Sequence, residues 1–297
     1  MVSNASNMLI SSSAIDYQLL DTGNQRKLER FGEVILDRPE VEAKWNTSLS
    51  KKEWEKADWY FFEEVGKKGK WINKSSAPQD WLIGYNYKGI KLTFRLNITA
   101  FKHVGIFPEQ AENWNYIQDC LAQIKGEKKV LNLFAYTGAA SIVAAASGAV
   151  VTNVDSVKQV LNWGRENAEQ NKIDHIRWIL EDARKFVEKS LRRKDVYNGI
   201  IMDPPAFGFG TKNEKWKLEK DLNHLLEQSI QLLSKNQNFF ILNTYSPKLS
   251  MGQLQVMLKN LKHFPTEHEA RILGLATPQK KVLGLGNLIR FRNQSFA

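Results

Sequence analysis

Residues 130–154 read VLNLFAYTGAASIVAAASGAVVTNV and contain no charged side chain. A segment of this length could cross a bilayer, which takes about 20 apolar residues. Polar residues and glycines interrupt it, however, and its many alanines are only weakly apolar. It divides instead into a buried strand (Lys129–Phe134), a turn containing Gly138 (135–138), an Ala-rich helix (about Ala139–Ser147) and a second strand (Val150–Val154). Continuous apolar strands of this kind predict a parallel sheet covered by helices on both faces. The pattern therefore argues against a membrane span.

The same alternation continues to the end of the chain. The pattern predicts helices over 156–170, with Ser156 as N-cap, and over 182–191, 214–233 and 251–261. It predicts strands over 176–180, 196–202 and 238–244, and two closing strands near 268–273 and 287–292. A chain that alternates in this way forms an α/β fold with a doubly wound, Rossmann-like sheet, which binds ligands at the carboxyl ends of its strands.

The N-terminal part of the chain has a different pattern. Short strands separated by Gly, Asn or Asp turns are expected over 15–20, 31–36, 81–87 and 90–97. Five tryptophans are concentrated here: Trp45, Trp54, Trp59, Trp71 and Trp81. Such side chains either form the core of a small β domain, which we favour, or stack on unpaired bases. We therefore predict a β-rich N-terminal domain over residues 1–115 and an α/β domain over 116–297.

Composition and charge narrow the classes of partner. The 297 residues carry a net charge of +10, and residues 129–297 account for +9 of it. An excess of this kind attracts phosphate-bearing ligands, although it is also compatible with an ordinary solvated surface. The single cysteine, Cys120, excludes an internal disulfide framework and a Cys-rich zinc site. The five histidines show no metal-binding spacing, so no metal is predicted. Because the N-terminus lacks a secretory pattern, we expect a cytoplasmic protein without a membrane anchor.

Polar residues stand at the ends of successive predicted strands. Gly138 would let the backbone approach a ligand at a helix N-terminus. Asp155 follows the second strand, where an acid can accept both hydroxyls of a ribose, and Asp182 follows the third, where it could accept an adenine amino group. Only one glycine of a G-x-G-x-x-G pattern is present, and the GxxxxGK[ST] pattern is absent. The combination favours an adenosine cofactor without phosphates.

The fourth strand ends in Asp203–Pro204–Pro205–Ala206–Phe207. Two consecutive prolines remove two backbone donors and hold the turn in one shape. The carbonyl groups left free there, together with the Asp203 carboxylate, form a fixed acceptor site for an N–H group. Phe207 can stack on a planar ring. The stretch therefore predicts a site for a planar nitrogen acceptor.

These motifs resemble those of the class I S-adenosylmethionine-dependent methyltransferases, in the bacterial group typified by the large-subunit (23S) ribosomal RNA methyltransferases. VLNLFAYTG looks like the first cofactor motif, VTNVD the ribose-binding acid, LEDARKF the adenine-side acid, and IMDPPAFGFG the catalytic motif. The resemblance implies S-adenosyl-L-methionine as cofactor and RNA as substrate. It implies the following cofactor-binding residues: Phe134, Tyr136, Thr137 and Gly138 at the methionine part, Asp155 and Ser156 at the ribose, Asp182 and Ala183 at the adenine, and Phe107 and Gln110 in a loop over the site. Asp203, Pro204, Pro205 and Phe207 would be catalytic.

The sequence departs from this group at one position. Members that methylate carbon 5 of cytosine use a cysteine nucleophile after the fifth strand, because that carbon must first be activated by thiolate addition. Here residues 243–248 read NTYSPK, and Cys120 precedes the cofactor domain, where a buried helix position is expected. Transfer to a nitrogen that already has a lone pair is then the expected reaction.

We therefore expect an enzyme that methylates a base nitrogen of RNA, most simply ribosomal RNA. Two alternatives remain open. The acceptor could be a protein side chain or a small molecule, or the chain could be a non-catalytic RNA-binding protein on a degenerate methyltransferase fold. Neither the oligomeric state nor the atom that is methylated can be read from the sequence.

Overall fold

The computed structural model describes residues 7–63 and 69–294. The chain divides into two compact units, Met1–Glu112 with Leu273–Leu285, and Asn113–Ile272 with Gly286–Ala297. The first break lies near the boundary predicted at residue 115. The segment Leu273–Leu285, which we expected in the C-terminal domain, joins the first unit. The domain bounds 1–115 and 116–297 remain a prediction.

A single sheet organises the second unit. From β17 to β11, the strands of this sheet follow the order β17-β15-β12-β9-β10-β11. Their bounds are β9 (Lys129–Leu133), β10 (Val150–Asp155), β11 (Ile176–Leu180), β12 (Gly199–Met202), β15 (Gln237–Thr244) and β17 (Val282–Gln294). All neighbours from β15 to β11 run parallel, and β17 is antiparallel to β15. The doubly wound Rossmann-like fold is confirmed, with a closing strand that runs against the others. β17 is longer than expected, and so is β16 (Glu269–Ala276), which precedes it.

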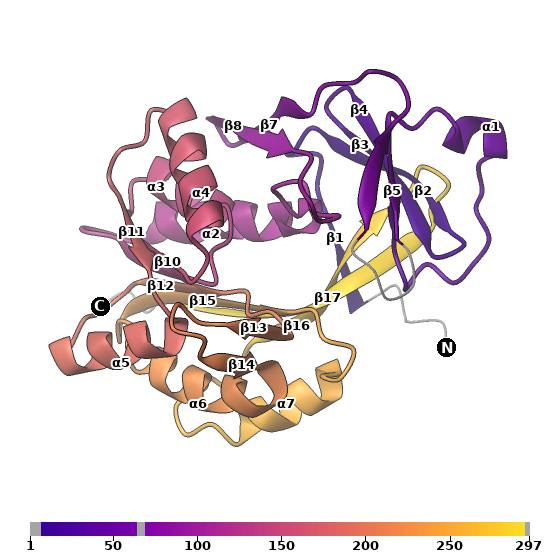
Figure 1. Ribbon diagram of the computed structural model, residues 1–297. Helices are drawn as coiled ribbons and strands as arrows, with labels where there is room; N and C mark the ends of the chain where they lie inside the picture. Colours follow the sequence, from indigo (N-terminus) through magenta and orange to yellow (C-terminus); the bar gives the residue numbers. More distant parts are fainter. Residues whose placement is uncertain (1–6, 64–68, 295–297) are drawn as a thin grey trace. The chain divides into compact units, whose positions relative to one another are not determined.

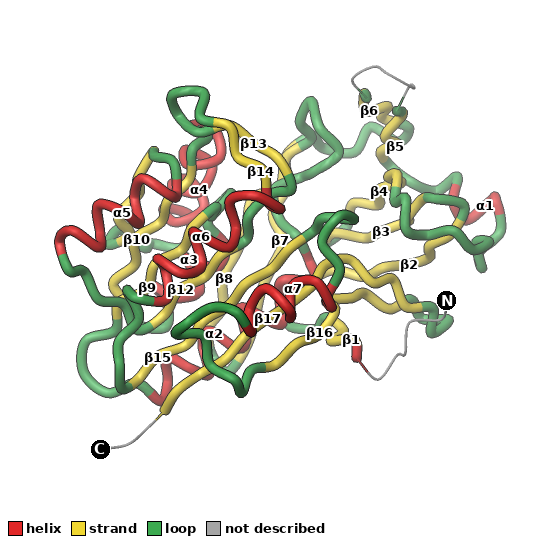
Figure 2. Tube along the Cα trace, turned by 90° about the horizontal axis from the view of Figure 1, so that it is seen from below, coloured by secondary structure: helices red, strands yellow, loops and turns green. Residues whose placement is uncertain are grey.

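Helices cover both faces of this sheet. They are α2 (Ala111–Gln123), α3 (Ala139–Ala146), α4 (Lys158–Gln170), α5 (Ala183–Arg193), α6 (Leu218–Ile230) and α7 (Met251–Lys259). Figure 1 shows α2, α3 and α4 on one face and α5, α6 and α7 on the other. Figure 2, seen from below, shows α5, α6 and α7 in front of the strands. The core between the second helix layer and the sheet includes Leu131, Phe186, Ile200, Leu222 and Phe240, all at most 2% exposed. Burial on both faces explains why these strands read as continuous apolar runs.

The stretch 130–154 forms the predicted strand, turn, helix and second strand. Within the described ranges, no helix is both long and apolar enough to span a membrane. α2 was not predicted as a helix from its own pattern, but it contains Cys120, which is 1% exposed. The expectation of a buried helical cysteine is therefore confirmed.

Two predictions on helix boundaries in this unit were wrong. The helix expected from Glu214 begins at Leu218, because Lys215–Lys217 forms β14, which pairs with β13 (Phe207–Phe209). In Lys215–Trp216–Lys217, successive side chains are exposed, buried and exposed. This alternation is typical of a strand and not of a first helical turn. Ser156 is not an N-cap, because α4 begins at Lys158 and Val157 occupies the cap position.

The first unit is β-rich, as predicted. One sheet has the order β2-β3-β4-β5-β6, formed by Tyr17–Gly23, Arg26–Phe31, Val34–Pro39, Trp59–Phe62 and Lys70–Asn73. β7 (Asp80–Tyr87) and β8 (Ile90–Asn97) form a hairpin. Shorter elements are β1 (Met8–Ile10), α1 (Lys51–Trp54) and the 3-10 helix η2 (Pro108–Gln110). The strand expected over 31–36 was wrong, because a turn after Phe31 separates β3 from β4.

The tryptophans of this unit form part of its core. Trp59 and Trp81 are buried, and the other three are partly buried. The indole N–H of each of the five donates to an acceptor within the same unit, namely the carbonyl groups of Thr22, Phe31, Pro78 and Phe101 and the carboxylate of Asp21. Anchored indoles of this kind favour the structural reading over base stacking.

Candidate functional site

The carboxyl ends of four parallel strands meet at one edge of the sheet. The register places Leu133 beside Val154 and Met202, and Asp155 beside Leu180. The segments that follow β9, β10, β11 and β12 therefore emerge side by side. This edge is where an open α/β sheet binds its ligand.

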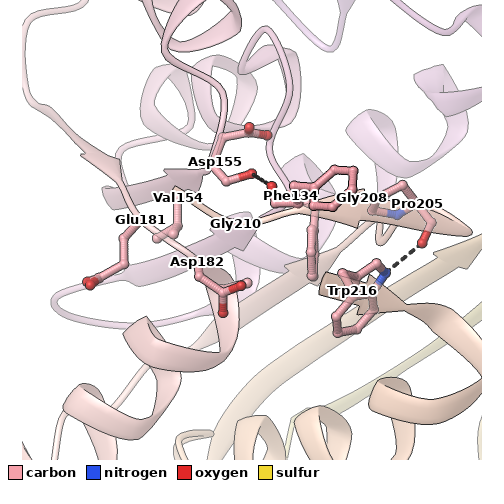
Figure 3. Close-up of a pocket in the computed structure, with 12 residues that line it drawn as sticks. Phe134, Val154, Asp155, Glu181, Asp182, Pro205, Gly208, Gly210 and Trp216 are labelled. Atoms are coloured by element: carbon pink, nitrogen blue, oxygen red, sulfur yellow. Dashed lines mark hydrogen bonds between the residues drawn. The ribbon is translucent and has the colours of Figure 1, made fainter. Parts of the chain in front are cut away.

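A partly open pocket lies at this edge. Figure 3 shows Asp155, Asp182, Phe134 and Trp216 around it. The residues that line it are Phe134, Val154, Asp155, Ser156, Glu181, Asp182, Ala183, Pro205, Gly208, Phe209, Gly210 and Trp216. The predicted residues Phe134, Asp155, Ser156, Asp182, Ala183 and Pro205 are among them. Of the other six residues, Gly208, Phe209 and Trp216 belong to the β13–β14 pair.

The loop after β9 has an unusual backbone. Phe134, Tyr136 and Gly138 all have positive φ angles, of 57°, 51° and 74°. The first two are not glycines, and backbone strain of this kind is concentrated at ligand-binding sites. The Tyr136 N–H donates to Asp155 Oδ2 at 2.9 Å, and the Gly138 N–H donates to the Ala135 carbonyl at 2.9 Å. The neighbouring strand thus holds the loop in its strained shape.

Tyr136, Thr137 and Gly138 belong to this loop but do not line the pocket. Thr137 is buried at 1% exposure, and Gly138 is the N-cap of α3. Their expected contacts with a cofactor remain predictions. Phe107 and Gln110 lie in the first unit, at the N-cap and the last residue of the 3-10 helix η2. Their expected role over the site likewise remains a prediction.

Asp155 occupies the end of β10. Its Oδ1 accepts the Val157 N–H and its Oδ2 accepts the Tyr136 N–H, each at 2.9 Å. Burial raises the pKa of this carboxyl, and the backbone N–H groups of Val157, Tyr136 and Ser156 oppose the rise. A carboxylate can accept about four hydrogen bonds, so some acceptor capacity remains for a ligand. Ser156 beside it donates its hydroxyl to the Phe209 carbonyl at 3.0 Å.

Asp182 combines two tasks at the end of β11. It is the N-cap of α5, accepting the N–H groups of Arg184 and Lys185. Its Oδ2 also accepts from Arg184 Nη2 at 3.0 Å. The carboxylate is therefore fixed in direction at the pocket wall, and Ala183 follows it at the first helical position, where backbone N–H groups lack helical partners.

The turn after β12 holds the predicted catalytic residues. The Asp203 N–H donates to the Leu133 carbonyl at 3.4 Å, which places this turn beside the loop after β9. Asp203 is partly buried, Pro204 is buried, and Pro205 and Phe207 are exposed. Among these residues, Pro205 lines the pocket, whereas Asp203, Pro204 and Phe207 lie outside its lining.

Trp216, which was not predicted as a site residue, connects these elements. Its indole N–H donates to the Pro205 carbonyl at 2.6 Å, as Figure 3 shows, and its ring lies 5.0 Å from that of Phe134. Trp216 is 3% exposed. The sequence pattern that could have predicted it is the tryptophan between two lysines, which is typical of a strand with one buried and two exposed side chains.

The pocket as a whole suits an adenosine ligand. It offers the Asp155 carboxylate with unused acceptor capacity, an aromatic wall from Phe134 and Trp216, and a helix N-terminus at Ala183. Within the described part of the chain, no group of three or more His, Cys, Asp or Glu residues could hold a metal ion. The geometry favours binding of a nucleoside beside the turn Asp203–Phe207, which we call the acceptor turn.

Comparisons with known proteins agree with this geometry. Residues 70–244 match the model of a family described as S-adenosylmethionine-dependent methyltransferase. A SAM-dependent methyltransferase from Agrobacterium tumefaciens is 34% identical, covering 97% of this chain and 93% of its own, with a TM-score of 0.89. The structure of SMU.776 complexed with SAH has a TM-score of 0.72 at 20% identity, covering 95% of this chain and 76% of its own, and shows the same fold.

Curated relatives match a shorter segment. The ribosomal RNA large subunit methyltransferase K/L of Shewanella frigidimarina is 35% identical over 147 residues. The protein of the same name from Pseudoalteromonas translucida is 32% identical over 162 residues. The matches cover 48% and 50% of this chain but only 20% and 22% of those relatives. The matched half of this chain therefore spans only about a fifth of the length of these relatives.

Proposed function

Because the chain belongs to the S-adenosylmethionine-dependent methyltransferase family, we propose that it methylates a base nitrogen of RNA, with ribosomal RNA as the substrate. The observation that carries the proposal is the Asp203–Phe207 turn, which Trp216 fixes beside the pocket that Asp155 and Asp182 line. The names of the ribosomal RNA methyltransferases to which the chain is similar support the RNA part. A cytoplasmic location belongs to the same proposal.

S-adenosylmethionine, when bound, supplies a methyl group activated by the positive sulfonium. In our proposal the Asp155 carboxylate accepts the ribose hydroxyls, using the lone pairs that the backbone leaves free. Asp182 and the Ala183 N–H bind the adenine edge, and Phe134 packs against the cofactor. These residues come from three neighbouring strand ends, so the binding site is set by the sheet register.

The acceptor is held by the turn after β12. Asp203 and the Pro204 carbonyl accept hydrogen bonds from the acceptor N–H, which orients the nitrogen lone pair and gives its proton a partner. Phe207, 51% exposed, stacks on the ring that carries this nitrogen. Orienting the reacting atoms in this way is the main catalytic contribution expected for a nucleophile that needs no activation.

The cysteine supports nitrogen over carbon 5 as the acceptor. Cys120 is 1% exposed in α2, and burial raises the pKa of its thiol to about 11. A thiol of this kind is almost fully protonated at pH 7 and does not act as a nucleophile. The end of β15, where a catalytic cysteine would be expected, carries Asn243 and Thr244, both buried.

Radiolabelled methyl transfer into cell extract, divided by sensitivity to RNase and to protease, tests the proposal. We expect label in RNase-sensitive material, and its loss in Asp203→Ala while calorimetry shows unchanged cofactor affinity. Label in protein would support the side-chain alternative. An Asp203→Ala enzyme as active as the wild type would remove Asp203 from the mechanism.

A further inference from the structure

β13 and β14 form a short two-stranded ribbon between the acceptor turn and α6. Phe207 pairs with Lys217, Gly208 with Trp216, and Phe209 with Lys215. Directly paired residues of antiparallel strands point to the same side of the ribbon, and successive residues point to opposite sides. Gly208 and Trp216 therefore share one face, the inner face. The other four residues share the outer face.

The inner face fixes the ribbon in place. Trp216 is buried, donates to the Pro205 carbonyl at 2.6 Å and packs against Phe134. Arg184 adds a further tie, since its Nη1 donates to the Lys215 carbonyl at 3.2 Å. These bonds and the strand pairing hold the ribbon in one conformation. Its outer face is therefore held in a defined place beside the acceptor turn.

The outer face combines aromatic rings with positive charge. Phe207 and Phe209 are each 51% exposed, with ring centroids 5.1 Å apart at 84°. Lys215 and Lys217 beside them are exposed, and across the described residues neither forms an ion pair. By contrast, Lys185, Lys189 and Arg193 on α5 each face a carboxylate. Two exposed rings flanked by two exposed lysines form a surface suited to a planar, anionic ligand.

We propose that the outer face of the ribbon binds the unpaired nucleotides that flank the methylated base in single-stranded RNA. Phe209 stacks on a neighbouring base, and Lys215 and Lys217 contact the phosphates. Stacking on aromatic side chains with basic residues along the backbone is how proteins bind single strands. A duplex hides its base faces, so this surface discriminates against it. The inference rests on the proposed RNA function and adds the form of RNA that the enzyme takes.

The test measures the binding of a fluorescein-labelled single-stranded RNA of about 12 nucleotides, a length within known site sizes, by fluorescence anisotropy. The first variant is Lys215→Gln/Lys217→Gln. Its matched control, Lys259→Gln/Lys262→Gln, makes the same charge change at and just after the carboxyl end of α7. A helix that follows a parallel strand returns to the opposite edge of the sheet, so these two lysines lie away from the ribbon. Phe209→Leu is the second variant and removes the stacking ring.

We expect the ribbon double variant to weaken RNA binding and to reduce the slope of log affinity against log salt by about 1.4, or about 0.7 per phosphate contact. The control should leave that slope unchanged. Phe209→Leu should weaken binding about tenfold, the lower part of the range for lost base stacking. Because Phe209 also lines the pocket, calorimetry with S-adenosylmethionine separates an effect on the cofactor from one on RNA. A duplex of the same length should bind more weakly than the single strand.

The ribbon assignment is overturned if both ribbon variants bind the single strand as the control does while the wild type still methylates RNA. It is also overturned if the duplex binds as tightly as the single strand and Phe209→Leu has no effect. Should the wild type label protein and bind no RNA, the proposed RNA function fails, and the ribbon assignment with it. The two failures are therefore distinguishable.

Discussion

Gly138 gives the sharpest test of how the cofactor loop is built. Its φ of +74° lies in the left-handed region, and a Cβ added there would lie 2.8 Å from Cη2 of Trp178. Trp178, on β11, also covers Gly164, where an added Cβ would lie 2.6 Å from Cζ3 of the indole. One ring therefore packs directly on two glycines. Gly138→Ala must both strain the backbone and displace that ring.

The two costs can be sized separately. An alanine in the left-handed region costs about 1 kcal/mol, and overpacking of a tight contact costs about 1–3 kcal/mol. We expect Gly138→Ala to lower the free energy of unfolding by about 2–4 kcal/mol. For a unit of this size this corresponds to a fall in Tm of roughly 4–16 °C. Because the loop continues into Phe134 at the pocket wall, we expect cofactor affinity to fall about tenfold or more.

Thermal unfolding and calorimetric titration with S-adenosylhomocysteine measure both effects. Gly148→Ala is the matched control, because Gly148 has a φ of +83° but nothing within 4 Å of an added Cβ. It should show the backbone cost alone and leave cofactor affinity unchanged. Adding Trp178→Leu to Gly138→Ala should recover the overpacking part through a coupling of about 1–3 kcal/mol. If Gly138→Ala costs no more than Gly148→Ala and binds the cofactor normally, the reasoning about the Trp178 contact is refuted.

Two further predictions concern titratable groups of the second unit. Cys120→Ala should retain methyl transfer, and the native thiol should resist alkylation at pH 8 because burial raises its pKa to about 11; loss of turnover in a folded Cys120→Ala protein would restore a cysteine mechanism. Burial also raises the pKa of Asp155 above its ordinary value of 3.8, so its carboxyl becomes protonated at a higher pH than a free aspartate. Calorimetry should therefore show the cofactor affinity declining as the pH is lowered from 7. Asp155→Asn should bind more weakly at pH 7 and vary less with pH, and an equally steep decline in that variant would exclude Asp155 as the cause.

The sequence was informative where burial and chain order determine position. β9, β10 and β12 are covered on both faces, so they appear as apolar runs, and the residues that follow each run are carried to the shared edge. Asp155 could therefore be placed at the pocket from the end of β10, and Asp182 from the end of the neighbouring strand β11. Asp203 could be placed at the end of β12, although it does not line the pocket itself.

The β13–β14 ribbon could not be found in the same way. Each of its strands has only three residues, and β13 has a glycine, which is typical of loops, at its centre. Its stability depends on Trp216 reaching Pro205, a contact that no local pattern encodes. The error at Phe31 has a similar cause, since a turn of only two residues, Gly32 and Glu33, separates two strands that otherwise read as continuous. Ser156 was taken for a helix cap because its actual partner, the Phe209 carbonyl, is 53 residues away.

The most direct test of the account is the identity of the methylated nucleoside. RNA labelled by the wild-type enzyme is digested to nucleosides and separated by chromatography with mass detection, with RNA treated by Asp203→Ala as the blank. The account predicts label in a nucleoside methylated on a base nitrogen, absent from the blank. Label in 5-methylcytidine, in a ribose methyl group or in no nucleoside would contradict it.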